Sequence, residues 1–210
     1  MATSSPNSQG AFVLATNNGA KVAELARLFE EAGLTLFSPA DFGARVSPEE
    51  NGGSFAENAK IKAEATRAEL RRRGRGDLGV VADDSGFEVD ALGGLPGVDS
   101  AYYLGEGASY EARMSHILAE MESANCRAAR YVCALACIMP DGGLVTVLET
   151  AEGEVAMSAR GAGGFGYDPI FWLPGLGKTM AELGLDEKNK ISHRGKAFRR
   201  LVAALSGGGA

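Results

Sequence analysis

The sequence predicts an α/β protein with a mixed β-sheet flanked by helices. Over the first half of the chain, short apolar strands alternate with amphipathic helices, which is typical of α/β architecture. Strand-like segments then follow one another around Asp141-Gly142-Gly143, which favours an antiparallel hairpin. The chain has 210 residues, 45% of them hydrophobic, so it is long enough for one domain with a substantial core. We expect that domain over residues 11–205.

The two ends of the chain are predicted to lie outside this domain. Residues 1–10 are small and polar and predict a disordered tail, and residues 206–210 (SGGGA) predict a flexible one. The N-terminal residues lack a basic region followed by an apolar one, so they do not resemble a secretory signal. No apolar run approaches the roughly 20 residues that span a membrane. We therefore expect a cytoplasmic protein.

The overall charge narrows the classes of partner. A net charge of −6 argues against a general nucleic-acid or membrane-surface binder, because those proteins need broad basic faces. It leaves room for a small anionic ligand. The three cysteines, Cys126, Cys133 and Cys137, form no CxxC pair and are interpreted as small apolar residues, with metal or redox chemistry as the alternative.

The first half of the chain is predicted to alternate strands and helices. Gly33 ends the first helix, and Ser54 with Glu57 matches a capping box that opens the second. The arginines at the end of the second helix interact favourably with the helix dipole, and we interpret them as solvent-exposed residues of the helix end. The expected strands are residues 11–15, 34–37 and 78–82, and the expected helices are residues 21–31 and 55–73.

The second half is predicted to begin and end with a helix. Met114, Ile117, Leu118 and Met121 share one face of the first of these helices. The expected helices are residues 110–123 and 192–205, the expected strands are residues 128–139, 144–151 and 153–158, and a short turn or helix is expected over residues 178–183.

Two adjacent acids, Asp83 and Asp84, end the apolar strand and are followed at once by Ser85-Gly86. A strand that ends in paired carboxylates and then turns is suited to Mg²⁺, which prefers oxygen ligands and keeps waters and substrate phosphates as the others. In an extended strand the two side chains point to opposite faces, so only one faces a site fully. We assign Asp84 the central role; the alternative is that these acids cap a turn.

The first junction between a strand and a helix could bind a phosphate. The loop Thr16–Lys21 (TNNGAK) opens a helix with backbone N–H groups, and Lys21 places a cation at the positive end of the helix dipole. That placement favours a bound phosphate, with an ordinary N-cap as the alternative. Asn58 and Lys62 lie four residues apart and share one face of the next helix, which could equally be a plain polar face.

Two C-terminal segments could contact a ligand, and an aromatic ring in the first could stack on a base. GAGGFGYDPIF places Phe165, Tyr167 and Asp168 among glycines that allow close backbone approach, or else forms a β-bulge with core aromatics. EKNKISHRGKA gathers basic residues against the acidic trend of the chain, and Ser192 is a predicted N-cap before His193 and Arg194. Cations at a helix N-terminus oppose the dipole, which a ligand with acceptor groups would explain.

Taken together, five segments closely resemble the inosine triphosphate pyrophosphatase family, the Ham1-like pyrophosphatases of non-canonical purine nucleoside triphosphates. They are TNNGAK, EENGGSFAENAKIKA, ADDSGFEVDALGGLPGVDSAYY, GGFGYDPIF and EKNKISHRGKA. The resemblance implies hydrolysis of ITP, dITP and XTP to the monophosphate and pyrophosphate, with one Mg²⁺ per subunit for which Mn²⁺ can substitute. It also implies a homodimer and an elongated ITPase-like fold, a mixed sheet of two lobes with the active site in a central cleft.

The resemblance also assigns the phosphate and metal site. Its triphosphate-binding loop falls on Thr16, Asn17, Asn18, Gly19, Ala20 and Lys21, and its helical lysine falls on Lys62. Its metal-binding glutamate falls on Glu49 or Glu50, with Glu49 favoured. Its metal-binding and general-base aspartate falls on Asp84, with Asp83 beside it and Ser85 touching substrate.

The base and sugar pocket implied by the resemblance falls on Phe165, Gly166, Tyr167, Asp168, Lys188, His193 and Arg194. The first loop departs from the family pattern, since Asn17 replaces a common glycine and Ala20 stands where glycine or lysine is frequent. Asparagine tolerates positive φ, so the loop is expected to keep its shape. The rival functions are a Maf-like pyrophosphatase for modified pyrimidine nucleotides and a nucleotide sensor that binds without hydrolysis.

Overall fold

The structure is a computed structural model that describes residues 10–207. The tails predicted over residues 1–10 and 206–210 therefore lie almost entirely outside the described residues. Gly10 forms a turn, and Ser206 and Gly207 belong to the last helix. Among residues 10–207, no helix is both long and apolar enough to cross a membrane.

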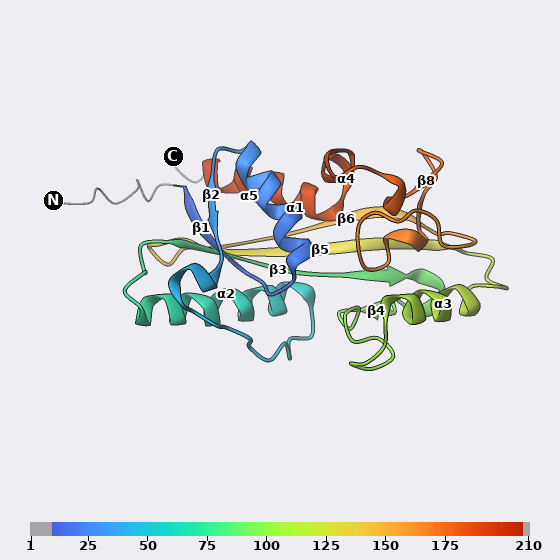
Figure 1. The fold of residues 1–210 in the computed structure, drawn as a ribbon, viewed down its shortest axis with the longest axis horizontal. Helices are drawn as coiled ribbons and strands as arrows, with labels where there is room; N and C mark the ends of the chain where they lie inside the picture. The colour runs from blue at the N-terminus through green and yellow to red at the C-terminus, as the bar shows by residue number, and fades with distance from the viewer. Residues whose placement is uncertain (1–9, 208–210) are drawn as a thin grey trace. The chain divides into compact units, whose positions relative to one another are not determined.

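Helices and strands alternate over the first half of the chain, and strands then follow one another, as the sequence predicts (Figure 1). The helices are α1 Gly19–Glu31, α2 Phe55–Arg72, α3 Tyr110–Glu120, α4 Leu185–Ile191 and α5 His193–Gly207. The strands are β1 Ala11–Ala15, β2 Thr35–Phe37, β3 Gly79–Val89, β4 Pro96–Gly97, β5 Ala128–Ile138, β6 Leu144–Val155, β7 Phe171–Leu173 and β8 Lys178–Thr179. Short 3-10 turns lie at Pro39–Phe42, Asp90–Leu92, Asp168–Ile170 and Met180–Glu182.

The predicted mixed sheet is confirmed. Within residues 10–207 the strands form one eight-stranded sheet in the order β2-β1-β3-β5-β6-β7-β8, with β4 paired to β3. β1 lies parallel to both β2 and β3, as expected when helices connect the strands. β3 with β4, β6 with β7, and β7 with β8 are antiparallel.

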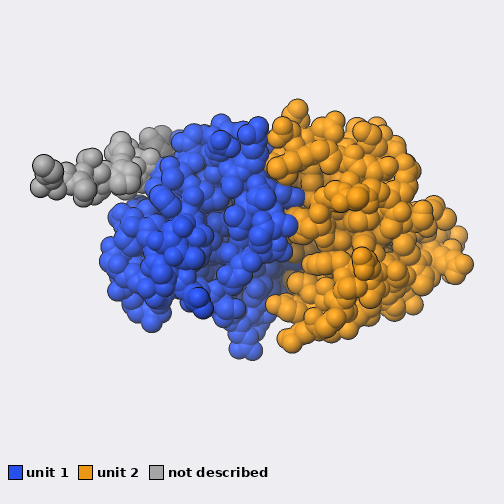
Figure 2. Space-filling view, viewed as in Figure 1, with its two compact units in different colours: residues 1–84, 134–148, 197–210 blue, residues 85–133, 149–196 orange. Residues whose placement is uncertain are grey.

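The chain forms two compact units, coloured separately in Figure 2. Among the described residues, unit 1 contains 10–84, 134–148 and 197–207, and unit 2 contains 85–133 and 149–196. Each unit is assembled from separate chain segments, so neither corresponds to a continuous piece of sequence.

Unit 1 has helices on both faces of its strands. In Figure 1, α1 lies on one side of β1 and β3, and α2 lies on the other. The Phe29 ring of α1 packs against Phe12 of β1 and Phe198 of α5, with centroids 5.6 and 4.8 Å apart. On the other face, Arg67 of α2 donates to the carbonyl oxygens of Met139 and Pro140 at 2.5 and 2.7 Å, which fixes α2 against the turn after β5.

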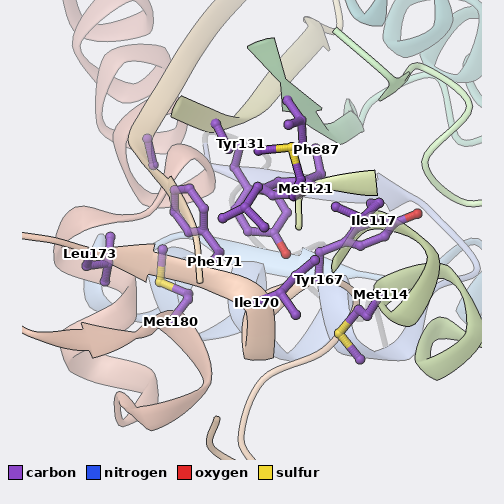
Figure 3. Packing of buried hydrophobic residues seen from close by; sticks show 14 residues of the cluster. Phe87, Met114, Ile117, Met121, Tyr131, Tyr167, Ile170, Phe171, Leu173 and Met180 are labelled. Carbon is purple, nitrogen blue, oxygen red and sulfur yellow. The ribbon is translucent and has the colours of Figure 1, made fainter. Parts of the chain in front are cut away.

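Unit 2 has an aromatic core (Figure 3). Phe87, fully buried on β3, stacks on Tyr167 with ring centroids 5.2 Å apart. It also contacts the rings of Tyr131 and Phe171 at 5.2 and 5.8 Å. The Tyr167 hydroxyl donates to the carbonyl oxygen of Ser100 at 2.8 Å, so its polar end is satisfied although the ring is buried.

One prediction about the paired acids is wrong. The strand was expected to end at Ala82 and turn at Ser85-Gly86, but β3 continues to Val89. β3 pairs with β1 as far as Ala82 and with β4 at Phe87 and Glu88. Neighbouring strands on both sides of the acids hold the backbone extended, and they override the turn preference of Asp, Ser and Gly.

Other expected elements also differ from the structure. The strands predicted over 144–151 and 153–158 are one strand, β6, which ends at Val155. Gly153 lies close against β7: a Cβ there would be 2.5 Å from the Trp172 carbonyl oxygen. Helix α4 was not predicted, and α5 ends at Gly207. The hairpin turn is confirmed, since the Met139 N–H donates to the Gly143 carbonyl oxygen at 2.8 Å.

Candidate active site

Asp83 and Asp84 pair with lysines from two different helices. Lys21 of α1 forms an ion pair with Asp83, and Lys62 of α2 forms one with Asp84 at 2.7 Å. Successive strand side chains point to opposite faces, and α1 and α2 cover opposite faces of β3 (Figure 1). The strand geometry therefore gives each acid its own cation.

The loop before α1 is held by its own side chains. Thr16 Oγ1 accepts from the Asn18 N–H at 3.1 Å, and Asn18 Oδ1 accepts from the N–H groups of Ala20 and Lys21 at 3.0 and 3.3 Å. Asn18 is therefore the N-cap of α1. Asn17 donates to the Val46 carbonyl oxygen at 3.3 Å, which gives this departure from the family pattern a structural use.

Lys62 joins Asp84 to a second acid. Its ammonium also donates to Glu50 Oε2 at 2.9 Å. The loop that carries Glu50 is fixed nearby, because Asn58 Oδ1 accepts from the Gly52 N–H at 2.9 Å. A Cβ at Gly52 would lie 2.7 Å from that amide oxygen, so glycine is required for the contact. Asn58 thereby supports the Glu50 loop from one turn before Lys62.

Asp84 is a buried carboxyl with incomplete hydrogen bonding. The residue is 6% exposed, and its Oδ2 atom is buried without a hydrogen-bond partner. Burial raises the pKa of Asp84 to about 6; Lys62 and Lys21 oppose this rise, and Asp83 adds to it. Burial would lower the pKa of Lys62, but Asp84 and Glu50 outweigh that effect and raise it, so Lys62 stays an ammonium.

The raised pKa of Asp84 predicts how stability depends on pH. Asp84 normally titrates near pH 4, so the fold favours its protonated form, and that stabilisation is lost as pH rises to about 6. In metal-free buffer, wild-type protein should lose up to about 3 kcal/mol of unfolding free energy relative to Asp84→Asn between pH 4 and pH 7.

Urea unfolding of both proteins at several pH values measures this difference. Asp77→Asn is the matched control, because Asp77 is an exposed acid just before the same strand. The same pH dependence in wild type and Asp84→Asn would contradict the prediction.

In unit 2, the loop before β7 is organised by Asp168. This carboxylate, 1% exposed, accepts from the Phe165 N–H at 2.8 Å and from the Lys188 ammonium. A Cβ at Gly164 would lie 2.0 Å from Asp168 Oδ2, and the φ of +68° also favours glycine. Lys188 lies 4.9 Å from the centre of the half-buried Phe165 ring, a cation–π distance.

The start of α5 supplies two further candidate side chains of unit 2, His193 and Arg194. Ser192 Oγ accepts from the Gly195 N–H at 3.1 Å, which confirms the predicted N-cap. Arg194, 1% exposed, donates to Ser85 Oγ at 2.9 Å, and its guanidinium lies 5.4 Å from the Phe165 ring centre. His193 stacks on Tyr131 with centroids 4.6 Å apart and planes 7° from parallel.

The structure thus gathers the candidate residues in two groups. The lysine–carboxylate group, in unit 1, contains Lys21, Glu50, Lys62, Asp83 and Asp84. The aromatic–cation group, in unit 2, contains Ser85, Phe165, Asp168, Lys188, His193 and Arg194. The groups follow one another in the chain at the Asp84–Ser85 peptide bond. Glu49, the favoured candidate, and Glu50 are both exposed, and Glu50 is the one that contacts Lys62.

The other candidates also have defined places. Tyr167 packs in the aromatic core, and Gly166, at φ +66°, lies between Phe165 and Tyr167. Gly19 is the exposed first residue of α1. Within the described chain, no group of three or more His, Cys, Asp or Glu side chains is arranged to hold a metal ion.

Three supporting residues were not given their roles by sequence reasoning. Tyr131 lay in a run interpreted only as a buried strand, and Gly164 was one glycine among several. Asn58 was noted only for sharing a face with Lys62. Each role depends on contact with a residue distant in sequence or on a backbone angle, so the sequence held no separate signal for it.

The mixed sheet, the lysines paired with strand carboxylates and the basic side chains around Phe165 define the class of α/β nucleotide-binding proteins. A family model described as the Ham1 family matches residues 12–204. The chain belongs to the Ham1 family, as the sequence motifs indicate.

Relatives and solved structures agree with this assignment. The chain is 47% identical over 191 residues to a dITP/XTP pyrophosphatase of Geobacillus kaustophilus, covering 90% of this chain and 91% of that protein. It is 44% identical to a dITP/XTP pyrophosphatase of Bacillus subtilis, covering 92% and 96%. A HAM1 protein structure from Coxiella burnetii matches with a TM-score of 0.82 at 36% identity, covering 93% of this chain and 98% of that one.

Proposed function

We propose that the chain is a nucleoside triphosphate pyrophosphohydrolase that removes non-canonical purine nucleotides, ITP, dITP and XTP, from the nucleotide pool. The observation that carries the proposal is the lysine–carboxylate group, in which buried Asp84 has an unpartnered Oδ2 beside Lys62. The names of the curated relatives, dITP/XTP pyrophosphatases, supply the substrate class.

The donor set of this group fits a divalent cation. The Glu50 and Asp84 carboxylates share one neighbour, Lys62, and Asp84 Oδ2 is a buried oxygen that still lacks a partner. Mg²⁺ is typically held by one or two carboxylates together with waters and substrate phosphates. We propose Mg²⁺ as the cofactor, with Mn²⁺ able to replace it, and favour Glu50 over Glu49 as the second ligand. When bound, the cation stabilises negative charge on the phosphates.

The side chains of unit 1 have distinct parts in the proposed reaction. Lys21 and Lys62 bind the phosphates and neutralise charge that develops on the departing pyrophosphate. Asp84, or Asp83 beside it, accepts a proton from a water molecule, whose oxygen bonds to the α-phosphorus as the bond to the pyrophosphate oxygen breaks.

The aromatic–cation group of unit 2 is proposed to recognise the base. Phe165 offers a ring for stacking, and Lys188, His193 and Arg194 offer donors. We assign His193 and Arg194 to the 6-oxo group of hypoxanthine and xanthine. Adenine has an amino group at that position and would leave those donors unpaired, which is a strong basis for rejection. Guanine shares the 6-oxo group, so its exclusion must depend on contacts near position 2.

We further propose that the protein acts in the cytoplasm as a homodimer on a free nucleotide. This part rests on the family resemblance and on the acidic net charge of −6, which does not favour nucleic acid as a ligand.

A substrate panel tests the proposed function. The purified chain with Mg²⁺ is incubated with dITP, ITP, XTP, GTP, ATP, dUTP and a modified pyrimidine triphosphate, and products are separated by ion-exchange chromatography. We expect monophosphate and pyrophosphate from dITP, ITP and XTP, with kcat/KM roughly 10²-fold above that for GTP or ATP. Release of inorganic phosphate would mean attack at the γ-phosphorus.

Two other outcomes would replace the proposal. Preference for the modified pyrimidine would indicate a Maf-like enzyme. Nucleotide binding without turnover would indicate a sensor.

A further inference from the structure

Lys62 bridges two acids that come from different parts of the chain. Its ammonium lies 2.7 Å from Asp84 Oδ1 on β3 and 2.9 Å from Glu50 Oε2 in the loop before α2. The side chains of Lys62 and Asp84 are 11% and 8% exposed, whereas that of Glu50 is 35% exposed. This contact draws the Glu50 loop to the buried strand.

The charges of this group are incompletely balanced. One ammonium serves two carboxylates, and Asp84 Oδ2 remains buried without a partner. The bridging ammonium therefore stands beside the two carboxylates proposed for the divalent cation. A second cation arriving at these oxygens would be repelled by Lys62 at close range, where a partly buried site screens charge poorly.

We propose that Lys62 is a built-in counter-cation that occupies the Glu50 and Asp84 carboxylates in the nucleotide-free protein, and that the divalent cation gains them only when nucleotide phosphates attract the Lys62 ammonium away. Lys62 then has two alternating partners, the carboxylates before binding and a phosphate after it. The inference rests on the proposed function, since it requires a polyphosphate ligand and a divalent cation in one site.

Two consequences follow from this exchange of partners. Nucleotide and metal bind with positive coupling, because each favours the state in which Lys62 has left the carboxylates. In addition, the nucleotide-free protein avoids holding a bare divalent cation, and the lysine keeps the two acids in place until the substrate arrives.

Binding of Mn²⁺ alone, without nucleotide, tests the inference. The electron paramagnetic resonance signal of free aqueous Mn²⁺ is followed as protein is added, which gives the dissociation constant. For wild type we expect binding only in the millimolar range. For Lys62→Met we expect affinity roughly 10- to 100-fold higher, the usual size of such couplings. Lys62→Arg keeps the charge and should resemble wild type.

Two further variants serve as controls, one for unfolding and one for the loss of a lysine elsewhere on the same helix. Lys62→Gln removes the charge but keeps a donor for Asp84, so it serves if Lys62→Met unfolds, and circular dichroism reports folding. Lys60→Met makes the same change on the same helix at a lysine that lies 3.8 Å from Glu64, and it should leave Mn²⁺ affinity unchanged.

Specific results would overturn the inference. A micromolar dissociation constant for Mn²⁺ in nucleotide-free wild type would by itself overturn the inference. Unchanged affinity in a folded Lys62→Met or Lys62→Gln protein would do so as well. If wild type still hydrolyses dITP in that case, the inference fails and the proposed function stands. If affinity rises but wild type hydrolyses no nucleotide, the proposed function fails separately.

Discussion

Asp84→Asn is expected to slow dITP hydrolysis by roughly 10³-fold, the size of effect seen when one electrostatic group is removed from an active site. Asparagine keeps the shape of the side chain, but it can neither accept a proton from water at Oδ2 nor give the site a negative charge. The buried position of Asp84 makes replacement by a solvent molecule difficult. Pyrophosphate release at saturating Mg²⁺ and dITP is the measurement.

The control for this experiment is Asp77→Asn, which changes an exposed acid seven residues earlier and should keep wild-type turnover. Circular dichroism of each protein establishes that it is folded. Pyrophosphate release by Asp84→Asn within about threefold of wild type would remove Asp84 from the mechanism.

Phe87→Ala is expected to lower the free energy of unfolding by about 3–5 kcal/mol, the usual cost of truncating a buried phenylalanine. Phe87 is fully buried and contacts the rings of Tyr131, Tyr167 and Phe171 (Figure 3). Truncation leaves a cavity where those rings meet. Urea unfolding followed by circular dichroism is the measurement.

Tyr102→Ala is the matched control for Phe87→Ala, because it also removes a ring from unit 2, but from a residue that is 56% exposed. A loss below about 1 kcal/mol in Phe87→Ala would mean that the core closes around the missing ring. Since Tyr131 stacks on His193, loss of this core should also disturb the aromatic–cation group.

The sequence indicated where helices and strands lie more accurately than where each one begins and ends. Hydrophobic periodicity located α1 and α3 because each helix buries one face, and capping residues such as Ser54 and Ser192 marked the starts of α2 and α5. It failed where tertiary pairing outweighs local preference. β3 runs through Asp83-Asp84-Ser85-Gly86 because β1 and β4 pair with it on either side of the acids.

For the candidate site, too, the sequence indicated some features and missed others. Short motifs indicated the residues that could bind phosphate, metal or a base. These motifs are a lysine near a helix start, the paired acids and a glycine-rich loop with aromatic residues. The partners of these residues could not be read from the motifs. Whether Glu49 or Glu50 meets Lys62 depends on how the loop before α2 is held, and Asn58 fixes that loop through the Gly52 N–H.

The sequence by itself determined the α/β class, the Ham1 resemblance and the identities of the acids and lysines. Only the tertiary structure decided which lysine meets which acid. Asp83 and Asp84 are adjacent in sequence, but successive strand residues face opposite sides, so Lys21 from α1 pairs with one and Lys62 from α2 with the other. The burial that raises the pKa of Asp84 arises in the same way, from elements distant in sequence packing around one strand.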